Sequence, residues 1–327
     1  MPAGDEFELI NRFFDKDQYR ADDVLCGIGD DAAVLQLTAG AQLVSACDTL
    51  VEGVHFPAGF AADSLAQRAL ATNLSDFAAM GATPRWLLLA LTLPAADQAW
   101  LERFASRLAT LALAHELVLV GGDTTRGPLT VTLTVLGSAH NGQLLRRSGA
   151  RAGDDLWVSG QLGAAAAGLN LLQQSAADFA PPASQARELI DAFVNPVPRL
   201  ALGKRLLSLA SAAIDVSDGL LADAGHIAKA SGVAIQIEGD ALPAPASLQG
   251  ATAPTDARRW IISGGDDYEL LFTAAPEQRL AIEELAAELE ITCTRIGTIQ
   301  PGSGVVLKGK GWDSLNASGY NHFAVEN

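Results

Sequence analysis

Apolar residues recur along the chain with two alternating periods, which predict helices and strands in turn. Residues 64–80 have apolar positions at helical spacing, and Gly81 supplies the expected stop. Residues 99–115 predict a second amphipathic helix. The continuous apolar run at 86–93 predicts a buried strand, and the threonines that alternate with apolar residues at 130–135 predict a half-buried one.

Shorter segments with the same two patterns fill the rest of the chain. The other predicted helices lie at 7–14, 164–172, 199–210, 218–231 and 276–289. Further strands are predicted at 32–37, 43–46, 117–120, 156–159, 213–215, 233–237 and 291–296, and segments 260–263 and 268–273 complete a second α/β layer. A meander of the two earliest strands would place Asp31 and Asp48 at facing strand ends. The alternation predicts an α/β or α+β fold.

Length and the Arg-, Gly- and Asp-rich segment 144–155 predict two domains, 1–147 and 148–327. Hydrophobic residues make up 49% of the 327 residues, which argues against disorder. The formal net charge of −16 disfavours nucleic acid as a partner. Three cysteines without close spacing disfavour a zinc site or disulfides. No leader-like run opens the chain and no apolar run is long enough for a bilayer, so we expect a cytoplasmic protein without a membrane partner.

Acidic turns beside small residues recur along the chain and suggest a shared chemistry. Mg²⁺ prefers oxygen ligands and usually combines carboxylates with water and substrate phosphates. Strand-to-loop junctions also carry Asp as an ordinary turn or cap residue, so a single such turn means little. Their number in one chain instead predicts a site for several Mg²⁺ ions and a polyphosphate, with the candidate ligands Asp31, Asp48, Asp76, Asp123, Asp215 and Asp218.

The usual nucleotide-binding loops are absent from the sequence. No G-x-x-x-x-G-K-[ST] occurs, and Gly27-x-Gly29 does not complete a dinucleotide fingerprint. Direct phosphate contacts could come from Arg146 and Arg147, because guanidinium groups match phosphate oxygens. Free N–H groups at the helix that begins with Asp218 offer a second possibility. His55 is a candidate for substrate contact, and no G-x-S-x-G elbow supports a hydrolase.

At these residues the chain strongly resembles the thiamine-monophosphate kinases of the aminoimidazole-ribonucleotide-synthetase-like superfamily. The matching strings follow the order of the family and cover nearly the whole chain: GIGDDAAV, CDTLVEGVHF, ALATNLSDFAAMGA, GGDTTRGPL, RRSGARAGDDLWVSG, AIDVSDGL, SGGDDYELLF and GYNHF.

The resemblance implies a kinase that transfers the γ-phosphoryl group of ATP to thiamine monophosphate. The products are thiamine diphosphate and ADP, and the reaction is the last step of thiamine diphosphate biosynthesis. It implies several Mg²⁺ ions, direct transfer without a phosphoenzyme, and no general base, since the acceptor phosphate is already anionic. It also implies a homodimer in which residues 1–147 bind ATP and metal and join their sheets into a barrel-like structure. Residues 148–327 would form an α/β domain that closes the active site.

The resemblance also implies individual roles for matching positions. The six aspartates already named would be metal ligands, with further metal contacts at Ala46 and Cys47. Nucleotide contacts are implied for Gly122, Arg147 and Ser217, and substrate contacts for His55, Asp266 and Tyr320. The family often has Glu at the position of Asp266. Asp30 is expected to serve the turn, whereas its neighbour Asp31 is the expected ligand.

Two alternatives stay open. The first is a sibling of the same superfamily, such as a selenophosphate synthetase or a hydrogenase-maturation protein. Cys26 does not lie in the reactive loop of the former, and the chain does not end in the Cys of the latter. The second is a regulatory protein that binds metal or nucleotide without turnover.

Overall fold

The structure, a computed structural model, describes residues 6–15, 19–140, 143–173, 179, 181–248 and 253–312. The chain divides into two compact units. The first comprises residues 1–77 and 82–143, and the second comprises residues 78–81 and 144–327. Both contain a β-sheet with helices, so the predicted fold class, a two-domain mixed α/β protein, is confirmed.

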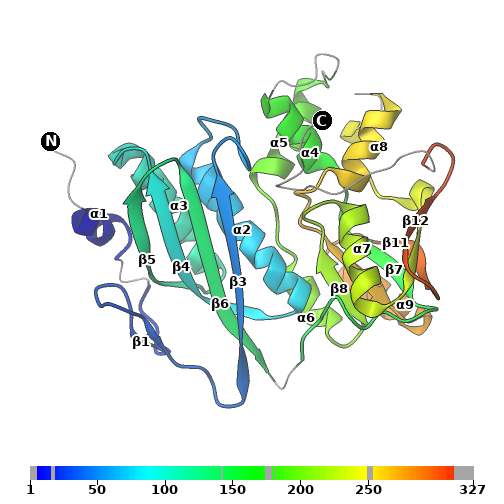
Figure 1. The fold of residues 1–327 in the computed structure, drawn as a ribbon, viewed down its shortest axis with the longest axis horizontal. Helices are drawn as coiled ribbons and strands as arrows, with labels where there is room; N and C mark the ends of the chain where they lie inside the picture. Colours follow the sequence, from blue (N-terminus) through cyan, green and yellow to red (C-terminus); the bar gives the residue numbers. More distant parts are fainter. Residues whose placement is uncertain are drawn as a thin grey trace. The chain divides into compact units, whose positions relative to one another are not determined.

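The first unit is built on a four-stranded sheet with the order β3-β6-β4-β5 (Figure 1). A separate two-stranded sheet pairs β1 with β2. The elements of this unit are α1 (Glu6–Phe13), β1 (Val24–Cys26), β2 (Val34–Leu35), β3 (Ala41–Val51), α2 (Ala62–Met80), β4 (Thr83–Leu93), α3 (Gln98–Ala114), β5 (Val118–Arg126) and β6 (Thr130–His140).

Helices α2 and α3 cover one face of the four-stranded sheet (Figure 1). Side chains alternate between the two faces of a strand, so Val131, Leu133 and Val135 of β6 are buried while the threonines between them are half-buried. Helix α3 begins where the Asp97 carboxylate accepts the N–H groups of Ala99 and Trp100, which caps the helix. The sheet is open in a single chain, with β3 and β5 as its edges.

The second unit is built on a six-stranded sheet with the order β12-β9-β11-β7-β10-β8. Its elements after residue 144 are β7 (Asp155–Ser159), α4 (Ala164–Gln173), α5 (Ala183–Val194), α6 (Leu200–Leu206), β8 (Ala212–Asp215), α7 (Leu220–Ser231), β9 (Ala234–Glu238), α8 (Pro254–Ser263), β10 (Leu270–Ala274), α9 (Arg279–Glu288), β11 (Cys293–Gln300) and β12 (Gly304–Lys308), with short 3₁₀ turns at Gly239–Ala241, Ala246–Leu248 and Pro276–Gln278.

This sheet is buried on both faces. Leu156 and Val158 of β7 belong to one apolar cluster, whereas Trp157 between them belongs to the other. Such two-sided burial explains why β7 reads as a continuous apolar run. Helix α7 ends at Gly232, whose φ of 68° gives the left-handed conformation that commonly stops a helix.

The structure corrects several sequence predictions. The predicted meander is wrong, because β2 pairs with β1, while β3 pairs with β6. Strand β3 runs from 41 to 51, so Asp48 lies inside a strand and not at its end. Segment 260–263 is the last turn of α8, and α5 was not predicted.

Two further predictions concern a membrane span and the end of the chain. Among the helices that the structure describes, none is both long and apolar enough to cross a membrane. Tyr320 and the closing GYNHF string lie outside the described residues.

Candidate functional site

A cavity of about 980 Å³ in the first unit brings together residues from distant segments. It lies between the turn at 27–33, which joins β1 to β2, and strands β4, β5 and β6. Asp31, Gly122 and Asp123 all line it. A Cβ atom at Gly122 would lie 1.8 Å from the carbonyl oxygen of Leu89, so only glycine fits this close approach of two strands. Three predicted site residues therefore share one cavity.

Asp30 makes hydrogen bonds within the turn before β2. Its Oδ1 accepts the N–H of Asp31 at 2.8 Å, and its Oδ2 accepts the thiol of Cys26 at 3.5 Å. These contacts agree with the expected role of Asp30 in the turn. Asp31 is exposed, and its role as a metal ligand stays a prediction.

Asp48 and Asp76 lie on the helix-covered side of the same sheet. Burial raises the pKa of the Asp48 carboxyl, and a hydrogen bond with Thr72 of α2 partly opposes that rise. Asp76 follows Thr72 by one helical turn, so it lies on the same face of α2. The structure therefore brings these two candidate ligands to one region.

Strand register places Asp48 and Asp123 on opposite faces of the four-stranded sheet. Thr49 of β3 pairs with Thr132, and their hydroxyls lie 2.9 Å apart. Thr132 pairs with Ala90, which pairs with Asp123, so this row shares one face. Asp48 precedes Thr49 and points to the other face. Since β6 and β4 separate β3 from β5, the two backbones are also roughly 14 Å apart.

The remaining candidates of the first unit lie on or next to β3. Cys47 is exposed, and its sulfur accepts the hydroxyl of Thr134 at 3.2 Å. Ala46 is half-buried in the same strand. The Nδ1 of His55 accepts the N–H of Val51 at 3.0 Å, which orients the ring.

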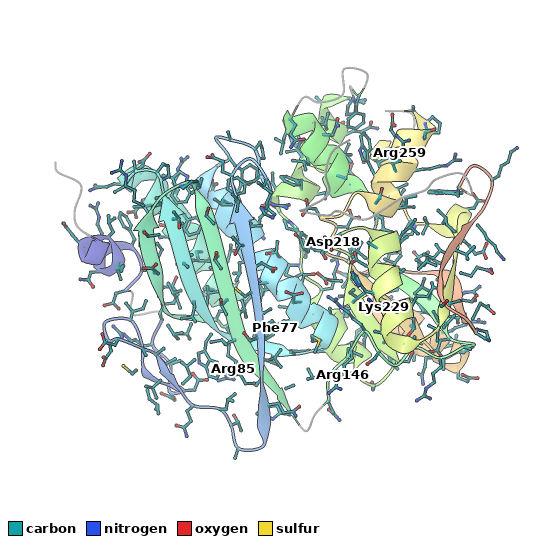
Figure 2. The ribbon with its side chains drawn as sticks, in the orientation of Figure 1. Phe77, Arg85, Arg146, Asp218, Lys229 and Arg259 are labelled. Atoms are coloured by element: carbon teal, nitrogen blue, oxygen red, sulfur yellow. The ribbon has the colours of Figure 1, made fainter. Side chains whose placement is uncertain are left out.

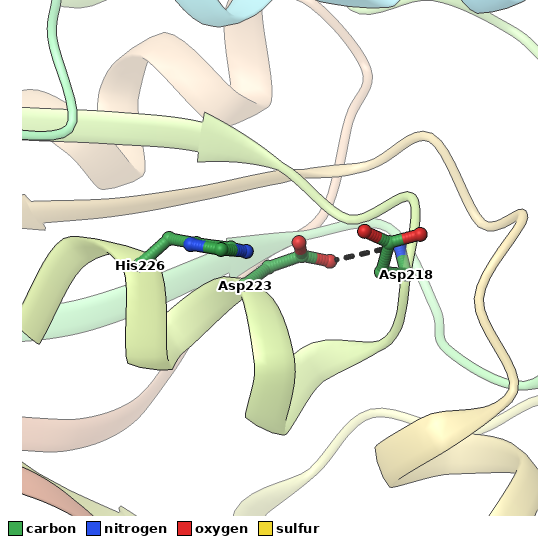
Figure 3. Close-up of side chains that lie close together, drawn as sticks. All are labelled: Asp218, Asp223 and His226. Atoms are coloured by element: carbon green, nitrogen blue, oxygen red, sulfur yellow. Dashed lines mark hydrogen bonds between the residues drawn. The ribbon is translucent and has the colours of Figure 1, made fainter. Parts of the chain in front are cut away.

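In the second unit, β8 ends at the buried Asp215 and a short loop leads to α7. Asp218 lies just ahead of this helix, and Lys229 lies in its last turn (Figure 2). The Oδ2 of Asp223, on α7, accepts the N–H groups of Ser217, Asp218 and Gly219 at 3.1, 3.2 and 3.1 Å. Figure 3 shows the bond to Asp218.

This arrangement corrects the prediction of free N–H groups for a phosphate, because Asp223 already occupies them. Burial is the main cause that raises the pKa of Asp223 to about 7, and the charges of Asp215 and Asp218 add to it. The sequence analysis missed Asp223. The available signal was an acidic residue in the first turn of a helix that follows a glycine.

A second loop, 264–269, is tied to the first. The N–H of Asp266 donates to the carbonyl of Ser217 at 2.9 Å, and that of Tyr268 donates to the carbonyl of Val216 at 2.9 Å. Asp266 and Tyr268 have φ angles of 61° and 50°, a conformation that costs energy and is common at ligand sites. The Tyr268 hydroxyl donates to Asp266 at 3.0 Å. The structure thus brings Ser217, Asp218 and Asp266 together.

An ion pair that the sequence analysis also missed holds this second loop in place. Arg199 donates to both carboxylate oxygens of Glu269, at 2.7 and 2.5 Å, and Ser159 donates to the same carboxylate. Because Glu269 directly follows Tyr268, this pair anchors the loop.

Arg146 and Arg147 are exposed in the segment before β7. The carbonyl of Arg147 accepts the hydroxyl of Ser231 at 3.0 Å, and that of Arg146 accepts the N–H of Ala213 at 2.9 Å. These bonds fix the backbone of both residues, and the phosphate contact stays a prediction.

The donor chemistry of the loop before α7 fits a hard cation. Ligand atoms of Asp218, Asp223 and His226 lie within 4.8 Å of one another (Figure 3). Asp215 adds a further negative charge that acts on Asp223. Clustered carboxylates repel one another, and a divalent cation relieves that repulsion. The carboxylate oxygens among these donors suit Mg²⁺, so Asp215 and Asp218 are compatible with the predicted role.

The fold and the acidic loops define a two-domain protein with a candidate metal-dependent phosphate site. The family model of the AIR synthase related protein N-terminal domain matches residues 29–139, and that of the C-terminal domain matches residues 151–310. The chain therefore belongs to the AIR synthase related family.

Within that family the chain is most informatively compared with thiamine-monophosphate kinases. It is 44% identical to the thiamine-monophosphate kinase of Salmonella typhimurium over 98% of each chain. The crystal structure of the thiamine-monophosphate kinase from Stenotrophomonas maltophilia K279a is 48% identical with a TM-score of 0.83, covering 93% of this chain and 95% of that one. AaThiL complexed with AMPPCP and TMP is 30% identical with a TM-score of 0.76, covering 97% and 96%.

Proposed function

We propose that this protein is a thiamine-monophosphate kinase, which phosphorylates thiamine monophosphate with ATP to give thiamine diphosphate and ADP. The observation that carries the proposal is the full-length match to relatives of that name, joined to acidic loops in both units. The complex of a relative with AMPPCP and TMP fits this pair of substrates.

Mg²⁺ is the proposed metal, held by Asp31, Asp48, Asp76, Asp123, Asp215 and Asp218, with further contacts from Ala46 and Cys47. When bound, it would neutralise charge on the two substrates' phosphates. Ligand atoms of Asp218, Asp223 and His226 that lie within 4.8 Å of one another, with Asp215 close enough to act on Asp223, support a cation in the second unit.

The chain's own residues would bind and orient the substrates. Gly122, Arg147 and Ser217 are proposed to contact ATP, and His55, Asp266 and Tyr320 to contact thiamine monophosphate. The hydrogen bond that orients the His55 ring and the strained backbone at Asp266 support defined positions for these two side chains. The acceptor phosphate is already anionic near neutral pH, so no side chain is required as a base.

The test is a turnover assay on the full chain. Purified protein with thiamine monophosphate, ATP and MgCl₂ should release ADP in a coupled assay and form thiamine diphosphate by chromatography, and EDTA should stop both. Asp48→Ala should abolish turnover while circular dichroism stays unchanged. Folded wild-type protein that binds ATP in calorimetry but releases no ADP above background would favour the regulatory alternative.

We propose further that the enzyme is a homodimer whose sheets meet through the edges β3 and β5. The edge strands β3 and β5 have no further strand paired to them in the described residues, and an unpaired edge can pair with a strand of another copy. The half-exposed sheet face opposite α2 and α3 would then be covered by the partner. Residues 1–147 would form this interface and bind ATP and metal, and residues 148–327 would complete the active site.

Asp48 and Asp123 of one chain lie three strands apart and on opposite faces of the sheet, so a single copy of the sheet does not bring them together. We therefore propose a site shared between copies, in which Asp31 and Asp123 of one copy act with Asp48 and Asp76 of its partner. The test mixes two inactive variants, Asp48→Asn and Asp123→Asn, after co-refolding. A shared site predicts about a quarter of wild-type activity, since half of the dimers are mixed and each holds one intact site. No recovery from mixed dimers would mean that each chain builds its own site.

A further inference from the structure

Asp223 binds three consecutive N–H groups through one oxygen, although its own side chain is not among the predicted ligands. Only 2% of the residue is exposed. Its Oδ2 lies 3.1 to 3.2 Å from the nitrogens of Ser217, Asp218 and Gly219. Successive N–H groups that converge on one point form an anion-binding nest, and here the anion belongs to the protein.

These bonds determine how the loop before α7 presents its side chains. The N–H of Ser217 is held by Asp223, and its carbonyl is held by the N–H of Asp266 at 2.9 Å. Gly219 has a φ of 113°, and a Cβ atom there would lie 2.7 Å from the Cα of Ser263. These bonds hold the backbone N–H groups of Ser217 and Asp218 and the carbonyl of Ser217, so they fix the positions from which the two side chains extend.

Asp223 does not occupy the position of an ordinary helix cap. A capping side chain belongs to the residue just before the helix and accepts N–H groups of the first turn. Asp223 instead lies on α7, four residues after Gly219, and its Oδ2 accepts the N–H groups of two predicted site residues, Ser217 and Asp218, as well as that of Gly219. These bonds therefore tie the site residues themselves to α7.

We propose that Asp223 is a positioning residue for phosphoryl transfer. It fills the nest at the start of α7 and so holds Ser217 and Asp218 in the geometry that receives nucleotide and cation. It also denies the nest to a phosphate oxygen, so that phosphate is bound through cations and not by the helix. This inference rests on the proposed kinase function.

The main variant is Asp223→Asn, which keeps the size of the side chain and removes its charge. We expect kcat to fall roughly 10- to 100-fold and the Mg²⁺ concentration for half-maximal activity to rise, with KM for thiamine monophosphate unchanged. The matched control is Asp154→Asn. Asp154 is likewise buried and accepts a backbone N–H, from Arg151, but its other partner, Ser211, precedes β8 at the end away from Asp215. We expect this control to keep the wild-type Mg²⁺ dependence.

A second measurement needs no turnover and no variant. In the metal-free wild-type protein, the amides of Ser217, Asp218 and Gly219 should exchange slowly with D₂O, and their proton resonances should lie downfield as expected for bonds to a carboxylate. Fast exchange at these three amides would overturn the proposal even if the variant did not fold. Wild-type kcat and Mg²⁺ dependence in a folded Asp223→Asn enzyme would overturn it also. A wild-type protein without kinase activity would refute the proposed function. The exchange data would still show whether Asp223 holds the three N–H groups.

Discussion

Buried aspartates at the two ends of the six-stranded sheet have different neighbours: arginines at one end and other aspartates at the other. Asp155 pairs across the sheet with Ala274 at the end of β10, whereas Asp215 pairs with Leu270 at its start. At the first end, Arg279 donates to Asp155 at 2.6 and 2.8 Å, and Arg295 adds a contact at 3.4 Å. These arginines, Arg279 foremost, hold the pKa of Asp155 below its ordinary value.

At the other end, the neighbours of a buried aspartate are other aspartates. Asp223 is held by backbone N–H groups and lies beside Asp215 and Asp218, and its pKa rises to about 7, chiefly through burial. The same sheet therefore lowers the pKa of one buried aspartate and raises that of another.

The difference separates stability from ligand binding. The arginines stabilise the buried Asp155 carboxylate in the folded state, because without them its charge would be buried and uncompensated. Carboxylates that crowd together oppose folding until a cation binds, which is the usual condition of a metal site. The acidic end should therefore respond to substitution in activity, and the arginine-matched end in stability.

The largest effect should come from Asp218→Asn at the acidic end. We expect kcat/KM to fall roughly 10²- to 10³-fold, the effect of losing one electrostatic contact to a transition state. The free energy of unfolding should stay the same or increase, since one repulsive charge is removed. Steady-state kinetics and urea unfolding of the same preparation measure both. A variant that loses stability in proportion to activity would contradict the separation.

The next largest effect should come from Asp155→Asn at the arginine-matched end. We expect a loss of about 2–3 kcal/mol in the free energy of unfolding, below the usual value for a fully buried pair because both arginines are about half exposed. The enzyme should keep its kcat and Mg²⁺ dependence at a temperature where it is folded. Changed Mg²⁺ dependence would show that the two ends are coupled.

Several elements were readable from the sequence because the signal was local. The alternation of threonine with apolar residues in β6 and the stop at Gly81 after α2 each need only a short window. The predicted strand 43–46 lies within β3, but its length and its partner were wrong, because β6 is about eighty residues or more away and no local signal specifies that pairing.

The site shows the same limit. Acidic turns predicted Asp215 and Asp218 as ligands, and the structure places Asp215 at the end of β8 and Asp218 in the loop that follows it. The role of Asp223 depends on three N–H groups that converge only when the loop and the first turn of α7 have formed, so its sequence position carries no such signal. The facing of Asp48 and Asp123 likewise follows from register across four strands.

A smaller effect is the pH dependence of the stability that Asp155 contributes. Because the folded-state pKa of Asp155 lies below its ordinary value near 3.8, its stabilising effect is complete above that value and is lost as the pH falls through the lower, folded-state pKa. The stability gap between the wild type and Asp155→Asn should therefore be constant from pH 7 to about 5 and shrink below about 4. Urea unfolding across this range measures the gap. A gap that widens in acid would mean that the arginines do not stabilise the charged form.

The smallest effect should come from Glu288→Gln, which removes an ion pair of similar geometry at the surface. Arg205 donates to both oxygens of Glu288 at 2.7 and 2.8 Å, but the two side chains are 52% and 57% exposed. Water and salt screen such a pair, and its members lose side-chain entropy to form it. We expect no measurable change in Tm, in a scan where Asp155→Asn serves as the positive control. If Glu288→Gln lowered Tm as much as Asp155→Asn, pairing with arginine would matter more than burial, and the contrast between the two ends of the sheet would lose its physical basis.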